Sequence, residues 1–219
     1  MRGRQFAAAL ALIASVGSAT AADAPKTWEG LELQSAKGLD LLYVRPATRF
    51  ETYTSVVIDA PIEVAFDKDW DPNRGVRGVS RQLSARNIQQ IRDEMATEFR
   101  KVFAEELARS GYAIVDQPGE QTLRVSASLA DVYINAPERM EVDNVVTYTL
   151  EPGRMTLEME LRDGPTGQLL ARVVDEKSGT NIGPLRVTNS MTNASDFRRA
   201  ARSWAQRLIK ALDMVSDKH

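Results

Sequence analysis

The sequence predicts a single α+β domain, a two-layer sandwich in which a mostly antiparallel sheet carries two main helices on one face. Residues 84–110 and the chain after residue 195 have apolar side chains three and four positions apart, which is typical of amphipathic helices. Residues 54–66 and 154–176 have apolar side chains at alternate positions, which indicates strands with one buried face. The strand–helix–strand succession around the first helix also predicts a βαβ unit with parallel strands.

The first strands are expected in two places. Residues 28–44 contain leucines interrupted by glycines, which indicates one or two short strands around a turn. Residues 54–66 form the next strand, and Pro61 within it has no N–H for a ladder hydrogen bond, so we expect this proline at an edge or a bulge. The alternating apolar face of this strand consists of Ile58, Ala60, Ile62, Val64 and Phe66.

The first long helix has signals at both ends. Ser84 is of a residue type that caps helix N-termini, and Gly111 stands where a left-handed residue ends a helix. Residues 112–115 then begin the second strand of the βαβ unit. The apolar stripe of the helix consists of Ile88, Ile91, Met95, Phe99, Val102, Phe103 and Leu107.

The strands that follow are antiparallel in character. The alternation that starts at Leu123 changes phase after Leu129, and either a bulge near Asp131 or burial of both faces would explain the change. Residues 154–176 predict a hairpin, because two alternating segments flank the turn residues 163–167.

The last part of the chain predicts a loop and then a helix. Residues 176–193 are mostly polar and contain two glycines and a proline, which is typical of a loop. Asn193 or Ser195 is expected to cap the final helix. Its apolar stripe consists of Phe197, Ala201, Trp204, Leu208, Leu212 and Val215.

The first 21 residues have the three parts of a secretory signal. Two arginines precede the apolar residues 6–16, and small residues follow at Ala19 and Ala21, the pattern that signal peptidase recognises. The apolar segment is far shorter than the roughly 20 residues that span a bilayer. We therefore expect cleavage before Ala22, a periplasmic or secreted protein, and no transmembrane anchor in the mature chain.

The composition of the mature chain excludes several classes of function. Residues 22–27 are expected to form a flexible lead, and residues 28–219 a single domain. The absence of cysteine excludes disulfides, a thiol nucleophile and the lipidated cysteine of a lipoprotein. The only histidine is the terminal His219, so neither a histidine base nor a histidine metal site is expected. Subtracting the two signal arginines from 28 Lys+Arg leaves 26 against 30 Asp+Glu, a net charge of −4 that does not favour nucleic acid.

An acidic loop contains the only residues that we single out for binding. Acids alternate from Asp67 onward as at the start of a calcium loop, but Pro72 and Gly78 stand where such a loop needs glycine and glutamate. A solvated loop is therefore favoured over a metal site. Trp70 either folds back as a lid on the core, which we favour, or forms a ligand platform. Asp69 and Trp70 are thus weak binding candidates.

Other charged residues allow two further interpretations. Paired carboxylates would suit glycoside hydrolysis, but alternating acids on a strand are also typical of an exposed sheet face. The available acids are Asp131, Glu158, Glu160, Asp163 and Asp175. Cations on the last helix would suit acidic ligands, but a solvated face is the favoured interpretation. They are Arg198, Arg199, Arg202, Arg207 and Lys210.

Several short segments in order resemble one family. They are residues 42–46 (LYVRP), 56–61 (VVIDAP), 64–70 (VAFDKDW), 155–157 (MTL), 160–163 (ELRD) and 166–172 (TGQLLAR). Together they resemble the bacterial domain of unknown function 3313, from about residue 28 to the C-terminus. The resemblance implies an envelope setting and one α+β domain, and it brings no catalytic residues. Many members are lipoproteins, and this chain departs from them because no cysteine follows its signal.

The sequence therefore favours an exported, non-enzymatic envelope module that binds a protein partner or a cell-wall component. It identifies no catalytic, cofactor-binding or metal-binding residues. Two alternatives stay open: an envelope polysaccharide hydrolase that uses paired carboxylates, and an auxiliary subunit of an envelope transport system. The oligomeric state is not predicted.

Overall fold

The computed structural model describes residues 24–73, 82–135, 139–142, 145–148, 151–178 and 190–216. The expected signal segment and its cleavage residues Ala19, Ala21 and Ala22 lie outside these residues.

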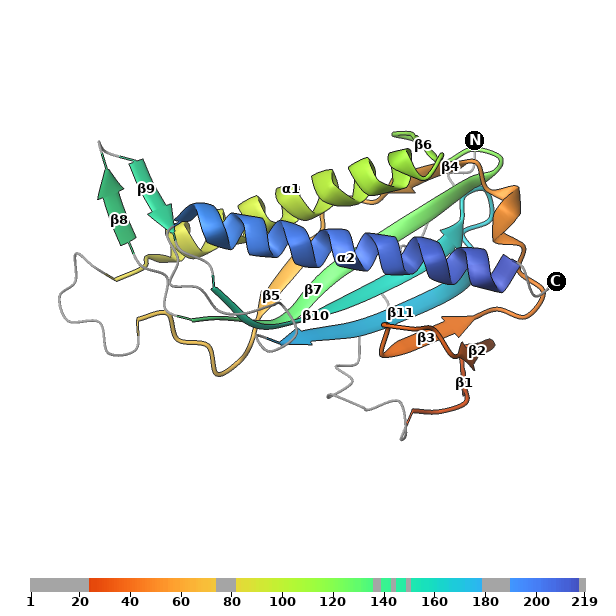
Figure 1. The fold of residues 1–219 in the computed structure, drawn as a ribbon, viewed down its shortest axis with the longest axis horizontal. Helices are drawn as coiled ribbons and strands as arrows, with labels where there is room; N and C mark the ends of the chain where they lie inside the picture. The colour runs from red at the N-terminus through yellow and green to blue at the C-terminus, as the bar shows by residue number, and fades with distance from the viewer. Residues whose placement is uncertain are drawn as a thin grey trace, which may run out of the picture.

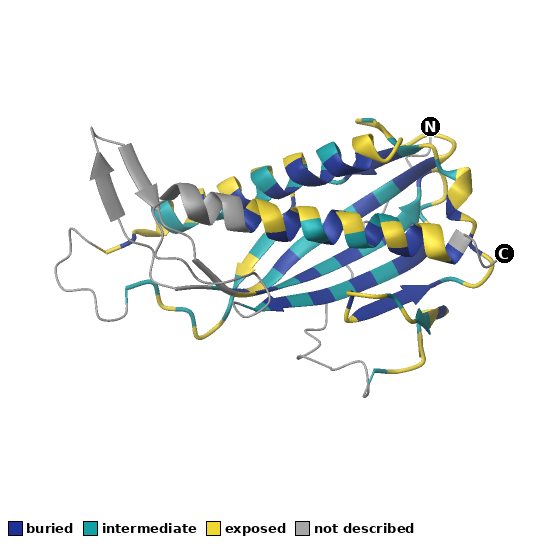
Figure 2. Ribbon diagram, in the orientation of Figure 1, coloured by how far each residue is buried: buried dark blue, intermediate teal, exposed yellow. Residues whose placement is uncertain are grey.

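Two helices lie across one face of a mixed, open sheet (Figure 1). Helix α1 spans Ala85–Arg109 and helix α2 spans Ser190–Ser216, and the two pack against each other. Their buried sides face the sheet and their exposed sides face outward (Figure 2). The predicted α+β fold with two helices on one face is confirmed.

The large sheet has nine strands, most of them antiparallel to their neighbours. The strands are β1 (Thr27–Trp28), β2 (Leu31–Gln34), β3 (Leu41–Val44), β4 (Ser55–Ile58), β5 (Glu63–Phe66), β6 (Ala113–Ile114), β7 (Thr122–Asn135), β10 (Glu151–Asp163) and β11 (Leu169–Ser178). Their order is β1-β2-β3-β11-β10-β7-β4-β6, and β5 pairs with β7. Strands β8 (Arg139–Val142) and β9 (Val145–Tyr148) pair separately, and the short 3-10 helix η1 spans Phe50–Thr52.

The parallel part of the sheet confirms the βαβ prediction. Strand β4 pairs in parallel with β6 after the α1 crossover, and β4 and β5 both pair in parallel with β7. The hairpin of β10 and β11 is also confirmed, with pairs from Arg154–Ser178 to Arg162–Leu169. At its turn the Tyr53 hydroxyl donates a hydrogen bond to Asp163 Oδ1 (3.0 Å).

A bulge in β7 explains the phase change in the sequence. Asp131 has a φ of 49°, and both neighbours of β7 change register around it. On the β5 side, Val64 is opposite Leu129 and Phe66 is opposite Val132, so three residues of β7 match two of β5. The extra residue places Leu129 and Val132 on the same face, where both are 0% exposed.

The predicted strand over 54–66 is wrong in one respect, because it is divided into β4 and β5. The interruption contains the cis Ala60–Pro61 bond, and Ala60 is exposed whereas Ile62 is buried. The Asp59 carboxylate accepts hydrogen bonds from Arg124 (3.0 Å) and Ser126 (2.6 Å) of β7, which hold the chain at this point. The even alternation of apolar residues does not reveal this interruption, and Pro61 is the only sign of it.

The capping predictions hold for α1 and fail for α2. Ser84 Oγ accepts from the Asn87 N–H (3.2 Å), and Asn87 Oδ1 accepts from the Ser84 N–H (3.0 Å). Gly111 has a φ of 98°, as a left-handed helix stop requires. Helix α2 begins at Ser190, so Asn193 and Ser195 lie inside it. Of the predicted loop, residues 176–178 belong to β11 and residues 190–193 to α2, and the rest lies outside the described residues. Residues of the capping type also occur in first turns, so their presence did not fix the boundary.

We predict different outcomes for two substitutions at the bulge. Asp131→Gly should change the free energy of unfolding by less than about 1 kcal/mol, because glycine adopts positive φ freely. Asp131→Val should lower it by about 1–2 kcal/mol, because a β-branched side chain is strained there. Urea denaturation measures both, and equal effects would contradict the importance of the backbone conformation.

A pH dependence is expected from Tyr53. Burial, and then the hydrogen bond to Asp163, raise the pKa of Tyr53 from 10.0 to about 12. This group therefore stabilises the fold fully below pH 10, and the contribution is lost as the pH rises through 12. Between pH 10 and 12, the free energy of unfolding should therefore fall less steeply with pH in Tyr53→Phe than in the unchanged protein, as measured by urea denaturation at each pH. The same steepness in both proteins would contradict the assignment to Tyr53.

Candidate functional site

The acids considered for hydrolysis do not form a free pair. They lie in four separate places. Asp131 is at the bulge, Asp163 at the hairpin turn, and Asp175 on the sheet face under α2, whereas Glu158 and Glu160 are on the face of β10 that is turned away from the helices. The two on β10 are each paired with an arginine, Glu158 with Arg172 at 3.4 Å and Glu160 with Arg162 at 2.7 Å. Among the described residues, no group of three or more acids or histidines is arranged to hold a metal ion.

The acidic loop uses its carboxylates to form turns. Asp67 Oδ1 accepts from the Asp69 N–H (2.8 Å), and Asp71 Oδ1 accepts from the Asn73 N–H (2.9 Å). The first of these bonds, followed by the ion pair with Arg154, lowers the pKa of Asp67.

The two weak binding candidates lie in this loop. Asp69 is exposed, and Trp70 is stacked on Phe66 with ring centroids 3.9 Å apart at the edge of the core. This position is the one expected of a lid, and a ligand contact at either residue stays a prediction.

A buried charged cluster fixes α2 to β11. Asp175 and Lys177 are 2% and 4% exposed, and their charged atoms are 3.4 Å apart. Trp204 Nε1 donates to Asp175 Oδ2 (2.7 Å), and the Asp40 N–H donates to Oδ1 (3.0 Å). Burial raises the pKa of Asp175 and lowers that of Lys177, while their mutual attraction opposes both shifts. The cluster therefore lies inside the molecule, between α2 and β11.

Four of the five cations of α2 are exposed, as expected of a solvated face, and three of the five also contact other elements. Arg198 pairs with Glu98 of α1 (2.6 Å), and Arg207 donates to the Gly38 carbonyl (2.5 Å). Arg202 pairs with Glu106 of α1 (3.1 Å), a buried residue that also accepts from Gln206 (3.0 Å). These contacts join the two helices and the β2–β3 connection.

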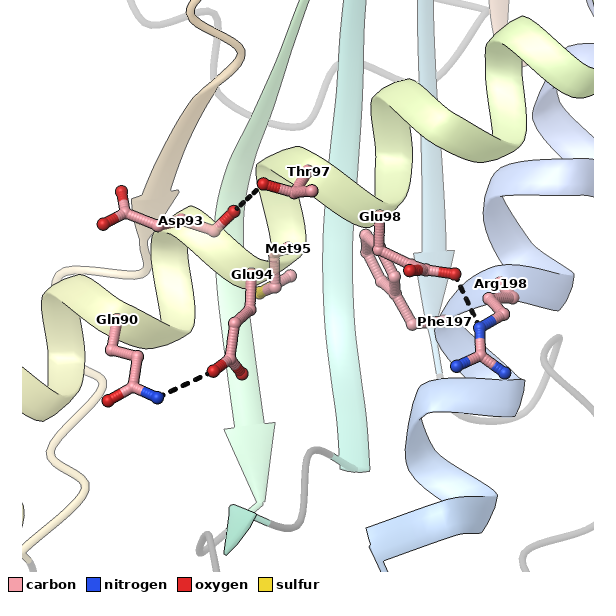
Figure 3. A pocket seen from close by; sticks show the side chains of 8 residues that line it. All are labelled: Gln90, Asp93, Glu94, Met95, Thr97, Glu98, Phe197 and Arg198. Atoms are coloured by element: carbon pink, nitrogen blue, oxygen red, sulfur yellow. Dashed lines mark hydrogen bonds and ion pairs between the residues drawn. The ribbon is translucent and has the colours of Figure 1, made fainter. Parts of the chain in front are cut away.

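The exposed side of α1 is hollowed on both flanks, and this region is the candidate functional site. The first hollow, of about 430 Å³, lies between α1 and α2 (Figure 3). Buried Met95 and Phe197 line it together with acidic residues of α1, and the Glu98–Arg198 pair crosses from one helix to the other. Gln90 donates to Glu94 (2.8 Å), so part of the acidic lining is already satisfied.

The second hollow, of about 550 Å³, is a groove between α1 and the segment 60–65. We call it the β5 groove; the residues of α1 that line it are Gln89, Arg92, Asp93, Ala96, Thr97 and Arg100. Among the described strands, β5 pairs only with β7, so no described strand pairs with its other edge, which we call the open edge of β5. The Arg92 guanidinium lies 5.2 Å from the centre of the Phe66 ring, and Arg92 Nε is buried with no acceptor in the described structure.

Sequence reasoning missed the β5 groove. Its lining joins two segments about 30 positions apart, and periodicity does not show that they lie side by side. The one available signal was Pro61, which was expected at a strand edge or a bulge. Of the two binding candidates, Trp70 also lies near this groove in space, because Phe66 contacts both Trp70 and Arg92.

Comparisons with known proteins identify a family and no activity. Residues 21–208 match the family model described as protein of unknown function (DUF3313), as the sequence resemblance predicted. No curated protein matches. Within the described residues, neither helix is apolar enough over its length to cross a bilayer.

Solved structures show distant similarity. One is a PelC dodecamer from Paraburkholderia phytofirmans, with 11% identity over 79% of this chain and 96% of that chain and a TM-score of 0.35. Another is a DUF4136 family protein from Bacteroides thetaiotaomicron, with 12% identity over 84% of this chain and 98% of that chain and a TM-score of 0.39.

The buried cluster gives a prediction about stability. Asp175→Ala should lower the free energy of unfolding by about 3–5 kcal/mol, because it leaves Lys177 buried without its counter-charge. Adding Lys177→Met should restore part of the loss, since no uncompensated charge is then buried there. Urea denaturation measures both variants. A double variant no more stable than the single one would show that the Trp204 hydrogen bond, and not the charge pair, is the essential contact.

Proposed function

We propose that this chain, which belongs to the DUF3313 family of proteins of unknown function, is an exported, non-enzymatic binding module of the bacterial envelope. In this proposal, cleavage before Ala22 releases the mature protein into the periplasm or the medium. It then binds an envelope protein through the exposed side of α1 and the β5 groove. The observation that carries the proposal is the open edge of β5 beside a hollow of about 550 Å³.

An open strand edge is a binding feature because it presents unpaired backbone donors and acceptors. Proteins that do not use such an edge usually cover it or place charges along it. Here the edge runs beside α1 and leaves a groove, which gives a partner both backbone groups and side chains to contact. The hollow between α1 and α2 extends the same surface, because Asp93 and Thr97 line both hollows.

The hydrolase alternative has less support. A retaining or inverting glycosidase needs two acids across the scissile bond, one of them free to carry a proton. Glu158 and Glu160 share a face, but each forms an ion pair with an arginine. An auxiliary role in envelope transport is compatible with the proposed surface, and would differ only in the identity of the partner.

Site-specific photocrosslinking in living cells tests the proposal. A benzophenone amino acid in place of Gln89 or Thr97, both exposed on α1, should capture a partner in the envelope fraction. The same substitution at Lys210, an exposed position on α2 outside both hollows, is the matched control and should capture much less.

Two outcomes would overturn the proposal. One is equal or absent crosslinking at the α1 positions and at Lys210. The other is hydrolysis of peptidoglycan fragments by the purified protein together with loss of that activity in Glu158→Gln. A crosslink to glycan instead of protein would overturn the choice of partner.

A further inference from the structure

We infer that the β5 groove binds an extended peptide segment of the partner, which adds a strand to β5 and carries two carboxylates four residues apart that pair with Arg92 and Arg100. This inference rests on the proposed function and specifies the ligand of the same surface. Three observations support it. They are the backbone groups of β5 that point away from β7, the spacing of the two arginines on α1, and the positions of the two acids that also line the groove.

The backbone phase determines which groups of β5 are available. The Asp67 N–H donates to the Val132 carbonyl of β7 (3.0 Å), so the backbone groups of Asp67 point toward β7. Successive residues of a strand direct these groups to opposite edges, so those of Val64 and Phe66 point away from β7. A peptide along the outer edge would therefore bond to the backbone of Val64 and Phe66.

The spacing of the arginines determines the side chains that a peptide needs. Arg92 and Arg100 are eight residues apart on α1, a rise of about 12 Å along the helix. An extended chain covers about the same distance in four residues, and residues four apart point to the same side of a strand. Carboxylates at positions i and i+4 of the peptide would thus reach both guanidinium groups.

Arg92 also has an unused donor. Its Nε is buried without an acceptor in the described structure, while its guanidinium lies over Phe66. Arginine binds carboxylates through paired N–H groups, which makes a carboxylate the ligand that best completes this side chain.

The two acids that line the groove do not prevent this arrangement. Asp93 Oδ1 already accepts from Gln89 Nε2 (2.9 Å), so that carboxylate is partly satisfied. Val64 packs against the core, so the alternation of a strand directs the side chain of Glu63 to the opposite face. The arginines are therefore the cationic groups that a strand beside α1 would meet, next to the Asp93 carboxylate.

A defined peptide tests the side-chain part of the inference. The probe is a fluorescently labelled peptide of about seven residues, with glutamates at its second and sixth positions and threonine or valine elsewhere. Fluorescence anisotropy with the purified protein should show binding, weakened at least ~10-fold by Arg92→Gln combined with Arg100→Gln. A peptide with glutamates at the second and fifth positions should bind as weakly, because its carboxylates point to opposite sides.

Backbone methylation tests strand addition without changing the protein. N-methyl groups on alternate amides of the peptide should abolish binding in one phase and leave it unchanged in the other, because only one edge of the peptide faces β5. Val64→Pro should also abolish binding, since it removes an N–H from the outer edge where proline is tolerated. Circular dichroism and urea denaturation should show that this variant is folded.

The outcomes separate this inference from the proposed function. Absence of peptide binding at millimolar concentration, equal binding of both glutamate spacings, or equal effects of the two methylation phases would each overturn the inference. The proposed function would still stand if Gln89 and Thr97 crosslinked a partner protein. Failure of crosslinking at those positions would overturn both.

Discussion

Strand β7 must pair with two different kinds of neighbour, and the bulge at Asp131 is the constraint on which the rest of the sheet depends. One edge of β7 pairs antiparallel with β10, and the other pairs in parallel with β4 and then β5. A regular strand would turn Val132 to the open face, because it follows Leu129 by an odd number of residues. The extra residue keeps both side chains under the helices, and it places β5 in register beside α1, where the groove forms.

The helices are held to this sheet by apolar packing that is supplemented by a few buried polar contacts. Trp204 is 0% exposed, and an indole buried this deeply needs a hydrogen-bond acceptor, which Asp175 provides. Between the helices, the buried carboxylate of Glu106 is likewise an acceptor, because Arg202 and Gln206 of α2 both donate hydrogen bonds to it. These contacts define how α2 lies on α1, and therefore the shape of the hollow that the two helices share.

The accuracy of sequence reasoning depended on how local each signal was. The hairpin of β10 and β11 and the cap at Ser84 were predictable, and the bulge near Asp131 was one of two explanations offered for the phase change, because each depends on residues within a few positions of one another. The division of β4 from β5 was missed because the alternation continues through it, and the fixing contacts come from Arg124 and Ser126. The ion pair of Arg198 with Glu98 and the β5 groove were not predictable, because both require knowledge of which distant segments meet.

The three tryptophans occupy three different environments, and this makes the protein's own fluorescence informative. Trp28 lies near Tyr43 on the sheet face that is turned away from the helices, and the Arg172 guanidinium carbon is 4.3 Å from the centre of its indole ring. Trp70 stacks on Phe66 beside the groove, and Trp204 is enclosed between the layers. Variants that retain one indole at a time would report separately on the N-terminal strands, the groove and the interior, so a local opening could be distinguished from complete unfolding by emission alone.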